Sequence, residues 1–305
     1  MITFEVLIND ELMSNLDTSF NSKGNEKLLS LLNDFENGKW RFTKFQGFIL
    51  NNMIETALSQ DEKEKLAGQY HSSLVEAAKN LRLTDKENET GKGSELAEIL
   101  LYGVMKHHYN GLPVVPKIFY KQNTQDNAKG SDSVHIVLED NDDFSIWLGE
   151  AKFYKDLDAA MGAAIDSIKE SLETEKLKKE NRIITGLNDI DKLLENNKGL
   201  RDKIKSFLDN GNSIDNFKPK LHIPILLLYE CEKTKNNTTM SDEYLTEIKA
   251  FHISKARKYF DKQIEQLSSI YQYTDIKFHL ILFPVPNKQE IVDKFISNVK
   301  FYKEQ

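Results

Sequence analysis

Two apolar runs lie on either side of a short polar segment in the middle of the chain. The first run follows Gly130 and extends to Leu138, and the second extends from Phe144 to Phe153. The five residues between them, 139–143, are Glu, Asp, Asn, Asp and Asp. Two apolar runs bounded by a polar turn are typical of paired strands. The pattern therefore predicts a β-hairpin with a long, acidic tip.

Apolar periodicity predicts a regular order of elements from Ser94 to the C-terminus: helix, three strands, helix, buried strand, helix, strand and helix. Alternation of this kind indicates an α/β domain built in layers. A second charged helical stretch, 181–210, precedes the buried strand. The expected strands are 113–121, the two hairpin strands, 218–230 and 275–285; the other expected helices are 94–105, 155–178, 242–271 and 288–302.

The N-terminal part of the chain is predicted to be rich in helices. We expect one strand over 1–10 and helices over 25–35, 49–59 and the later part of 61–83. Trp40 and the phenylalanines that follow it are expected to be core residues, because aromatic side chains mainly bury area. A polar linker, Thr84–Gly93, follows. We therefore predict two domains, an α-rich region with one strand over 1–90 and a second domain over 91–305.

Composition narrows the class of protein. The 305 residues are 39% apolar and 29% charged, which is typical of a soluble globular chain with ample material for a core. The single cysteine excludes an intrachain disulfide, and no leader-like N-terminus or long apolar run is present, so we expect a cytoplasmic protein without a membrane span. A net charge of −7 means that a nucleic-acid substrate would need a local lysine-rich face or a partner.

The hairpin carries the candidate chemistry. Glu150 and Lys152 are two residues apart on one strand, so they point to the same face, and Asp132 stands at the entry of the other strand. Charges on a largely apolar face need partners, because their burial is otherwise costly. A divalent cation held by Asp132 and Glu150, with Lys152 beside it, would supply that partner. Mg²⁺ uses one or two carboxylates and can activate water at a phosphodiester, so the hairpin suggests metal-dependent phosphodiester hydrolysis.

The helix that begins at Ser94 adds two carboxylates. Ser94 is the expected N-cap, and Glu95 and Glu98 lie one turn apart in the first turns of the helix. Carboxylates at this position also complement the helix dipole without any further role. Both interpretations stay open from the residues alone.

The order of these motifs resembles the PD-(D/E)xK nuclease superfamily. That resemblance implies a restriction-endonuclease-like core, a mixed sheet flanked by helices. It places Asp132 at the first acidic position, although Ser131 stands where the family often has proline, and it places Glu150 and Lys152 at the second acidic and lysine positions. It further implies Glu98, with Glu95 as the alternative, as the helix carboxylate. The implied ligands of Mg²⁺ or Mn²⁺ are Asp132, Glu150, Glu98 and the backbone carbonyl of Ala151.

Three segments, 93–101, 129–135 and 147–155, look like those of the nuclease subunits of Hachiman anti-phage defence systems. The resemblance implies a DNA-degrading effector that forms a heterodimer with a superfamily 2 helicase subunit, which controls it. The alternative is a catalytically inactive nuclease fold that docks a helicase or DNA. The pattern leaves open DNA or RNA as substrate, the trigger, and activity without the partner.

Secondary candidates are weaker. His135 lies three residues after Asp132 on the opposite strand face, where a structural role competes with one near the phosphate. Lys155 and the lysine-rich helix after it would suit a nucleic-acid backbone or equally a solvated face. The Lys/Glu run 173–180 is expected to be a solvated helix face. No P-loop sequence occurs, so we expect no ATP hydrolysis of that type.

Overall fold

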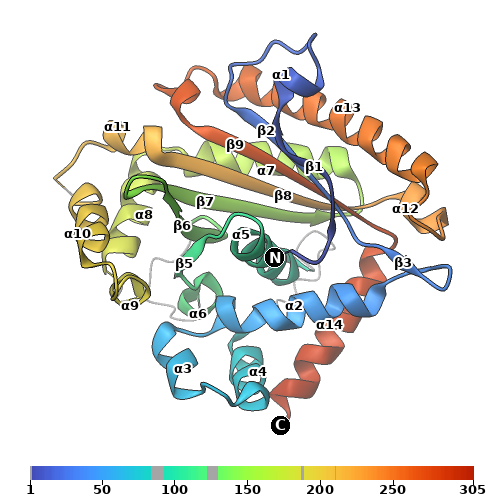
Figure 1. Cartoon of the computed structure of the whole chain (residues 1–305), viewed down its shortest axis with the longest axis horizontal. Coiled ribbons are helices and arrows are strands. Elements are labelled where there is room, and N and C mark those ends of the chain that lie inside the picture. Colours follow the sequence, from blue (N-terminus) through green and yellow to red (C-terminus); the bar gives the residue numbers. More distant parts are fainter. Residues whose placement is uncertain (1, 84–92, 122–129, 187–188, 210) are drawn as a thin grey trace.

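The structure is a computed structural model that describes residues 2–83, 93–121, 130–186, 189–209 and 211–305. Residues 84–92 of the expected linker and residues 122–129 lie outside the described residues. A mixed seven-stranded sheet with helices on both faces forms the centre of the molecule (Figure 1). The expected α/β class, a mixed sheet flanked by helices, is therefore confirmed.

The strand order of the sheet is β1-β2-β9-β8-β7-β6-β5. The four central strands β2, β9, β8 and β7 run parallel, and β1 at one edge and β6 and β5 at the other add antiparallel pairs. A separate two-stranded ribbon, β3–β4, lies outside this sheet. The strands are β1 (Glu5–Leu12), β2 (Glu26–Leu32), β3 (Phe35–Glu36), β4 (Lys39–Trp40), β5 (Leu112–Val115), β6 (Ser133–Glu139), β7 (Asp143–Tyr154), β8 (Leu221–Glu230) and β9 (Lys277–Val285).

The sheet separates two hydrophobic cores. Ile225 and Leu227 of β8 point into one core, and Leu226 and Leu228 point into the other, as the period of two along a strand requires. The first core is completed by α1 (Met13–Leu16), α7 (Leu157–Ser171), α8 (Thr174–Gly186), α9 (Asp189–Leu193), α10 (Lys198–Phe207), α11 (Ile214–Phe217) and α13 (Asp242–Leu267). The second core is completed by α2 (Phe42–Ala57), α4 (Tyr70–Asn80), α5 (Ser94–His107), α6 (Lys117–Lys121) and α14 (Lys288–Lys303).

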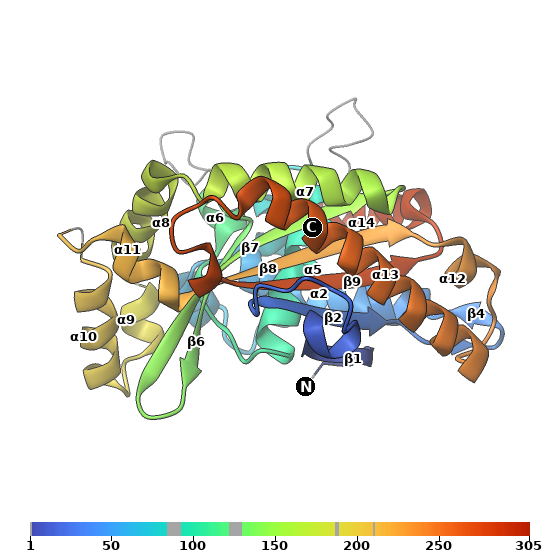
Figure 2. The same cartoon turned by 90° about the horizontal axis from the view of Figure 1, so that it is seen from above.

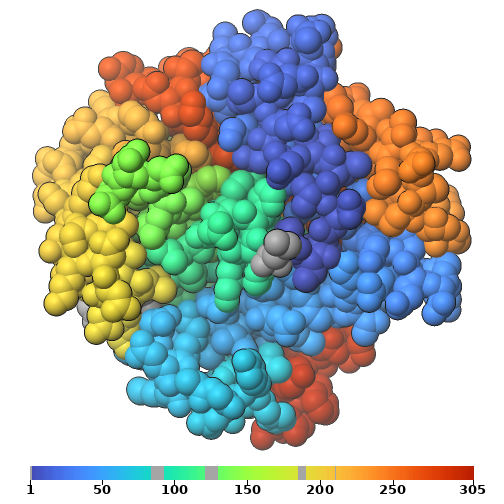
Figure 3. Space-filling view, in the orientation of Figure 1, coloured from blue at the N-terminus to red at the C-terminus, as the bar shows by residue number. Residues whose placement is uncertain are grey.

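Helices on the two faces are visible in different views. Figure 1 shows α13 above the strands and α2, α4 and α14 below them, and Figure 2 shows α7 and α13 running along the strands side by side. Two short helices, α3 (Gln60–Lys65) and α12 (Glu232–Asn236), lie outside these layers. Figure 3 shows α9 and α10, in yellow, packed beside the green hairpin, whose tip carbonyl at Asp142 accepts a hydrogen bond from Lys203 Nζ at 2.7 Å.

Side-chain caps fix the start of several long helices. Asp156 accepts a hydrogen bond from the Ala159 N–H at 2.7 Å and so begins α7 directly after β7. Ser241 caps α13 and Asn287 caps α14 in the same way. Polar caps satisfy N–H groups that the first helical turn leaves unpaired, so these residues set where each helix begins.

The hairpin itself is confirmed, but its tip is shorter than expected, because Glu139 pairs with Asp143 and only residues 140–142 form the turn. Two other predictions are wrong. Residues 25–35 were expected to be a helix, but they contain β2, which is buried on both faces. A parallel strand covered on both faces reads as a continuous apolar run, which periodicity cannot separate from a buried helix. Residues 113–121 were expected to be a strand, but β5 ends at Val115 and α6 begins after Pro116, a residue that favours the start of a helix.

Helix boundaries also differ from the expectation. The expected helix 155–178 ends at Ser171, and α8 begins at Thr174; the stretch 181–210 contains the end of α8, then α9 and α10. The N-cap of α5 is Gly93, with a φ of 90°, rather than Ser94, which is the first helical residue. Glycine adopts this left-handed conformation without steric cost.

The segment before residue 90 shares the central sheet with the C-terminal part of the chain. Strand β2 pairs with β9 in parallel, with Leu28 opposite Leu280. The expectation of one strand before residue 90 is wrong, because the described residues 2–83 contain four strands, β1 to β4, of which two join the large sheet. The division into domains at residue 90 stays a prediction. None of the helices in the described part of the chain combines the length and apolar composition that a bilayer crossing requires.

Candidate active site

The β6–β7 hairpin brings Asp132 next to the middle of β7. Ser133 at the start of β6 lies opposite Gly149, and the Asp132 N–H donates to the Gly149 carbonyl at 2.8 Å. The Ala151 N–H donates in turn to Asp132 Oδ2 at 3.1 Å. These two bonds flank Glu150, so the register of the hairpin places the Asp132 carboxylate beside the residue that carries the second carboxylate.

Glu150 and Lys152 share one face of β7 and contact each other. Lys152 Nζ lies 2.5 Å from Glu150 Oε1, and the two side chains are 20% and 12% exposed. The apolar residues that precede them on this face, Ile146 and Leu148, belong to the core on the α7 side of the sheet, as expected. Two charged side chains thus lie largely buried at the end of an apolar stripe. Because burial of an unpaired charge is costly, these charges must pair with each other or with a ligand.

The surroundings of Glu150 raise its pKa to about 7. Burial is the largest cause, and the neighbouring Asp132 carboxylate raises the pKa further, against the lowering effect of Lys152 and of a hydrogen bond from Ser167. Burial lowers the pKa of Lys152, but the charges of Glu150 and Asp132 outweigh burial and raise it. Asp132 and Glu150 therefore repel each other, and Lys152 stays an ammonium ion.

A pocket of about 310 Å³ opens over these carboxylates. Asp132 and Glu150 line it together with residues of α7 and α8, and Lys176 of α8 pairs with Glu170 of α7 at 2.7 Å. The lining residues are Gly130, Ser131, Asp132, Glu150, Ser167, Glu170, Ser171, Lys176, Lys179 and Glu180. This set places four carboxylates, three serines and two lysines around one cavity, and among the carboxylates Asp132 and Glu150 repel each other.

The donor set fits a hard divalent cation. Asp132 and Glu150 face the same cavity, and a cation between them would relieve the repulsion that raises the pKa of Glu150. Within the described residues, no group of three or more His, Cys, Asp or Glu side chains is arranged to hold a metal ion. Two carboxylates suffice for Mg²⁺, which usually keeps several waters and binds substrate phosphate as well.

Glu98 lies elsewhere. It is buried on α5, whose core residues pack with Ala151 and Phe153 on the face of β7 opposite to Glu150 and Lys152. It is not among the residues that line the pocket. Glu95, the alternative helix carboxylate, accepts hydrogen bonds from the N–H groups of Arg82 and Leu83, both at 2.8 Å. The structure therefore brings together Asp132, Glu150 and Lys152, and the metal role of Glu98 stays a prediction.

His135 and Lys155 also lie outside the pocket. His135 is fully buried on the α5 side of the sheet, where its ring lies 4.5 Å from that of Tyr102. Burial lowers its pKa to about 3, against the opposing charge of Glu55. Lys155 is exposed directly after β7. The Ala151 N–H donates a hydrogen bond to Asp132. A strand residue points its N–H and its carbonyl toward the same neighbouring strand, so the Ala151 carbonyl also points toward the side of Asp132.

Sequence reasoning missed Lys117 and Glu180. Both are buried, Lys117 on α6 and Glu180 on α8, and they form an ion pair with Nζ–Oε2 at 2.8 Å. Glu180 was expected on a solvated face within the run 173–180, and that expectation is wrong for this residue. It lies three residues after Leu177 and four before Ile184, which are both buried, so helical spacing could have placed it on the inner face.

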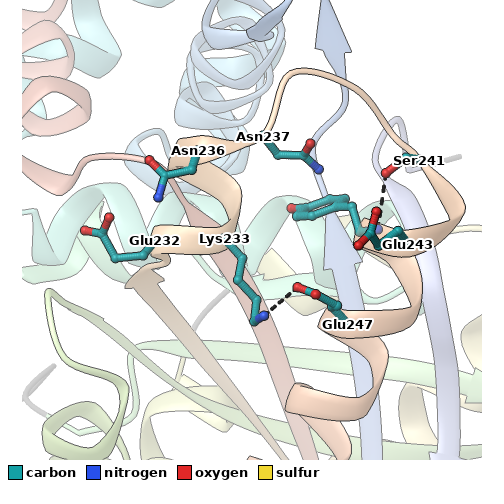
Figure 4. A pocket seen from close by; sticks show the side chains of 8 residues that line it. Glu232, Lys233, Asn236, Asn237, Ser241, Glu243 and Glu247 are labelled. Carbon is teal, nitrogen blue, oxygen red and sulfur yellow. Dashed lines mark hydrogen bonds and ion pairs between the residues drawn. The ribbon is translucent and has the colours of Figure 1, made fainter.

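A second pocket, of about 370 Å³, lies between α12 and α13 (Figure 4). Its polar groups have other roles: Lys233 pairs with Glu247 at 2.5 Å, and Ser241 accepts the Tyr244 N–H as the cap of α13. No residue predicted for the site lines it. The pocket over Asp132 and Glu150 is therefore the one that carries the candidate chemistry.

A search for similar curated proteins found no match. Comparison with protein families matches the HamA family over residues 7–299, nearly the whole chain. The match covers the hairpin, α7, α8 and all seven strands of the large sheet except the first two residues of β1. The chain therefore belongs to the HamA family, which places it in Hachiman anti-phage defence.

Proposed function

We propose that this chain is the nuclease effector of its defence system, a PD-(D/E)xK-type enzyme that hydrolyses phosphodiester bonds in DNA with Mg²⁺ or Mn²⁺. The observation that carries the proposal is the meeting of Asp132 and Glu150 in one pocket, with Lys152 Nζ 2.5 Å from Glu150. The order of helix, hairpin and helix around this meeting point, α5, β6, β7 and α7, matches the order in which that superfamily carries its motifs.

Asp132 and Glu150 would hold the metal, which supplies charge neutralisation at the phosphate and an activated water when bound. The Ala151 N–H orients the Asp132 carboxylate. The contact with Glu150 holds the Lys152 side chain in position. Because its surroundings raise the pKa of Lys152, this side chain remains protonated at neutral pH and acts as a fixed positive charge rather than as a base. A fixed charge beside the scissile phosphate stabilises the negative charge that develops there.

Lysines at the pocket provide a place for the nucleic-acid backbone. Lys176 and Lys179 of α8 line the same pocket as the two carboxylates. The chain as a whole has a net charge of −7, so its own surface gives little general attraction for DNA. We therefore propose that a superfamily 2 helicase subunit delivers DNA to this pocket and controls cleavage.

The test is a set of matched cleavage reactions with plasmid DNA and with RNA. The purified chain is assayed alone and with the helicase encoded beside it, in Mg²⁺ and in excess EDTA. We expect cleavage of DNA that requires Mg²⁺ and increases in the presence of the helicase. No cleavage in any Mg²⁺ reaction, or equal cleavage in EDTA, would contradict the proposal and favour a docking function for the fold.

A further inference from the structure

Glu180 connects α8 to the segment that carries Asp132. Its Oε1 accepts the N–H of Ser131 at 2.8 Å, one residue before Asp132. The residue is only 3% exposed, although it also contributes to the lining of the pocket. A charged acceptor strengthens a hydrogen bond to a backbone N–H, and burial strengthens it further. The chain before β6 is thus held by a side chain that comes from a helix about fifty positions later.

Lys117 fixes the Glu180 carboxylate from the opposite side. Its Nζ lies 2.8 Å and 3.1 Å from the two carboxylate oxygens, and the lysine is fully buried. The backbone N–H of Lys117 donates to the Tyr102 hydroxyl at 3.1 Å, which ties the start of α6 to α5. The carboxylate therefore stands in a frame built from three helices and cannot easily change its position.

The sequence leaves room for this contact by placing glycine at position 130. A Cβ added to Gly130 would lie 1.8 Å from Glu180 Oε1, closer than any side chain could approach. The close approach of the carboxylate to the backbone thus depends on the absence of a side chain there. The hydrogen bond from Ser131 to Glu180 therefore depends on the glycine before Ser131 as well as on the carboxylate.

Stability alone gives no reason for a buried ion pair at this point. Replacing such a pair by apolar residues of similar size is often neutral or stabilising, because both charges must be desolvated. A well-aimed acceptor for the Ser131 N–H, however, is something that apolar residues cannot provide. The position of Asp132 benefits directly, because its own N–H is fixed to Gly149 and the residue before it is fixed to Glu180.

We infer that Glu180, held by Lys117, is a positioning residue that keeps Asp132 aligned with Glu150. The inference rests on the proposed nuclease function for its consequence, but the contact itself is independent of metal and substrate. Catalytic groups must stay within about 0.5 Å of their productive positions, and a shift of about 1 Å can lower a rate by about 100-fold. Loss of the tether should therefore reduce kcat and weaken metal binding.

The experiment compares two double variants that differ only in the polar head of one side chain. Both carry Lys117→Met, which removes the buried cation. One adds Glu180→Gln, whose amide oxygen still accepts the Ser131 N–H, and the other adds Glu180→Met, which has the same length but no acceptor. Both remove the ion pair, so any difference between them reports the tether to Ser131.

Three quantities are measured: hydrogen exchange of the Ser131 amide without metal, Mn²⁺ affinity, and kcat and KM for DNA cleavage. Relative to the Gln variant, the Met variant should show Ser131 exchange that is at least tenfold faster. Its Mn²⁺ affinity should be several-fold weaker, and its kcat lower by about 100-fold with a KM changed less than threefold. The Gln variant should remain close to the wild-type protein in all three.

Equal exchange, affinity and kcat in the two variants would overturn the inference. If wild-type protein does not cleave DNA at all, the proposed function fails, but amide exchange and Mn²⁺ affinity still decide whether Glu180 positions Asp132. If neither double variant folds, the wild-type protein decides alone: the Ser131 amide should exchange as slowly as the hairpin amides of β6. Rapid exchange of this amide in the wild-type protein would overturn the inference without any variant.

Discussion

The Glu150 carboxylate lies 2.5 Å from the ammonium group of Lys152 and faces the same cavity as Asp132. This arrangement holds three charges, two negative and one positive, at a pocket in which the Glu150 and Lys152 side chains are largely buried. The net negative charge of the three groups favours a cation.

Metal binding should release a proton from Glu150 at acidic pH. Its pKa of about 7 in the metal-free protein means that the carboxyl is mostly protonated at pH 6 and mostly ionised at pH 8.5. A metal ligand must be deprotonated, so we expect release of about one proton per Mn²⁺ at pH 6 and almost none at pH 8.5. Calorimetry in buffers of different ionisation enthalpy measures this number. Equal proton release at the two pH values would contradict the assignment of Glu150 as a ligand.

Lys152 should matter for the rate of cleavage and not for metal binding. Lys152→Met removes a positive charge from beside the two carboxylates, so Mn²⁺ affinity at pH 8.5 should be at least that of the wild type. Cleavage should fall by about 100-fold or more, because a charge aimed at the developing phosphate charge is lost. Lys300→Met, at an exposed position on α14 and on the other face of the sheet, is the control and should cleave at nearly the wild-type rate. Loss of Mn²⁺ binding in Lys152→Met would assign the lysine a structural role instead.

Two glycines of the same region should respond in opposite ways to alanine. Gly162→Ala places a methyl group where nothing lies within 4 Å, inside α7, and should raise the free energy of unfolding by about 0.5–1 kcal/mol. Gly130→Ala pushes against Glu180 and should lower it by about 1–3 kcal/mol, with a loss of cleavage. Denaturant unfolding checks both values. A stabilised or fully active Gly130→Ala protein would show that the close contact is absent.

His135 should contribute to the acid sensitivity of the fold. Its pKa is about 3 in the folded protein and near 6.5 when the chain is unfolded, so the unfolded chain binds the proton more readily. Because the pKa of His135 is lower in the folded protein than in the unfolded chain, the stability that the neutral ring contributes is present above pH 6.5 and is lost as the pH falls. Between pH 7 and pH 5 the wild type should lose about 2 kcal/mol more than His135→Phe.

His135→Phe should also keep its cleavage activity, because the ring lies on the face of the sheet away from the pocket. Denaturant unfolding at several pH values measures the stability difference, and a plasmid assay measures activity. Identical pH profiles of stability in the two proteins would mean that His135 is not buried in its neutral form. A large loss of cleavage would place His135 near the substrate.

The hairpin was predictable from sequence because its register depends on local features. Asp132 and Glu150 lie 18 positions apart, on either side of one turn, and the period of two along β7 fixes which residues share a face. The same locality explains why the pairing of Glu150 with Lys152 was expected. A chemical site built on one hairpin needs little information about the rest of the fold.

Contacts between distant segments could not be predicted in the same way. Glu180 and Lys117 are 63 positions apart, so although helical spacing favours an inward position for Glu180, nothing in the sequence indicates that Lys117 is its partner. Strand β2 was mistaken for a helix because its environment, between β1 and β9, is supplied by segments at both ends of the chain. Glu98 is predicted as a ligand from its depth in a helix; it does not line the pocket, and its metal role stays a prediction.

The central claim is that Asp132 and Glu150 hold one catalytic cation, and Glu150→Gln tests it most directly. This variant keeps the size of the side chain and removes one ligand charge, and Glu175→Gln removes the same charge from an exposed position on α8 that does not line the pocket. Cleavage of plasmid DNA in Mg²⁺, with the helicase subunit present, should be lost in Glu150→Gln and unchanged in Glu175→Gln. Cleavage by Glu150→Gln at the wild-type rate would contradict the account.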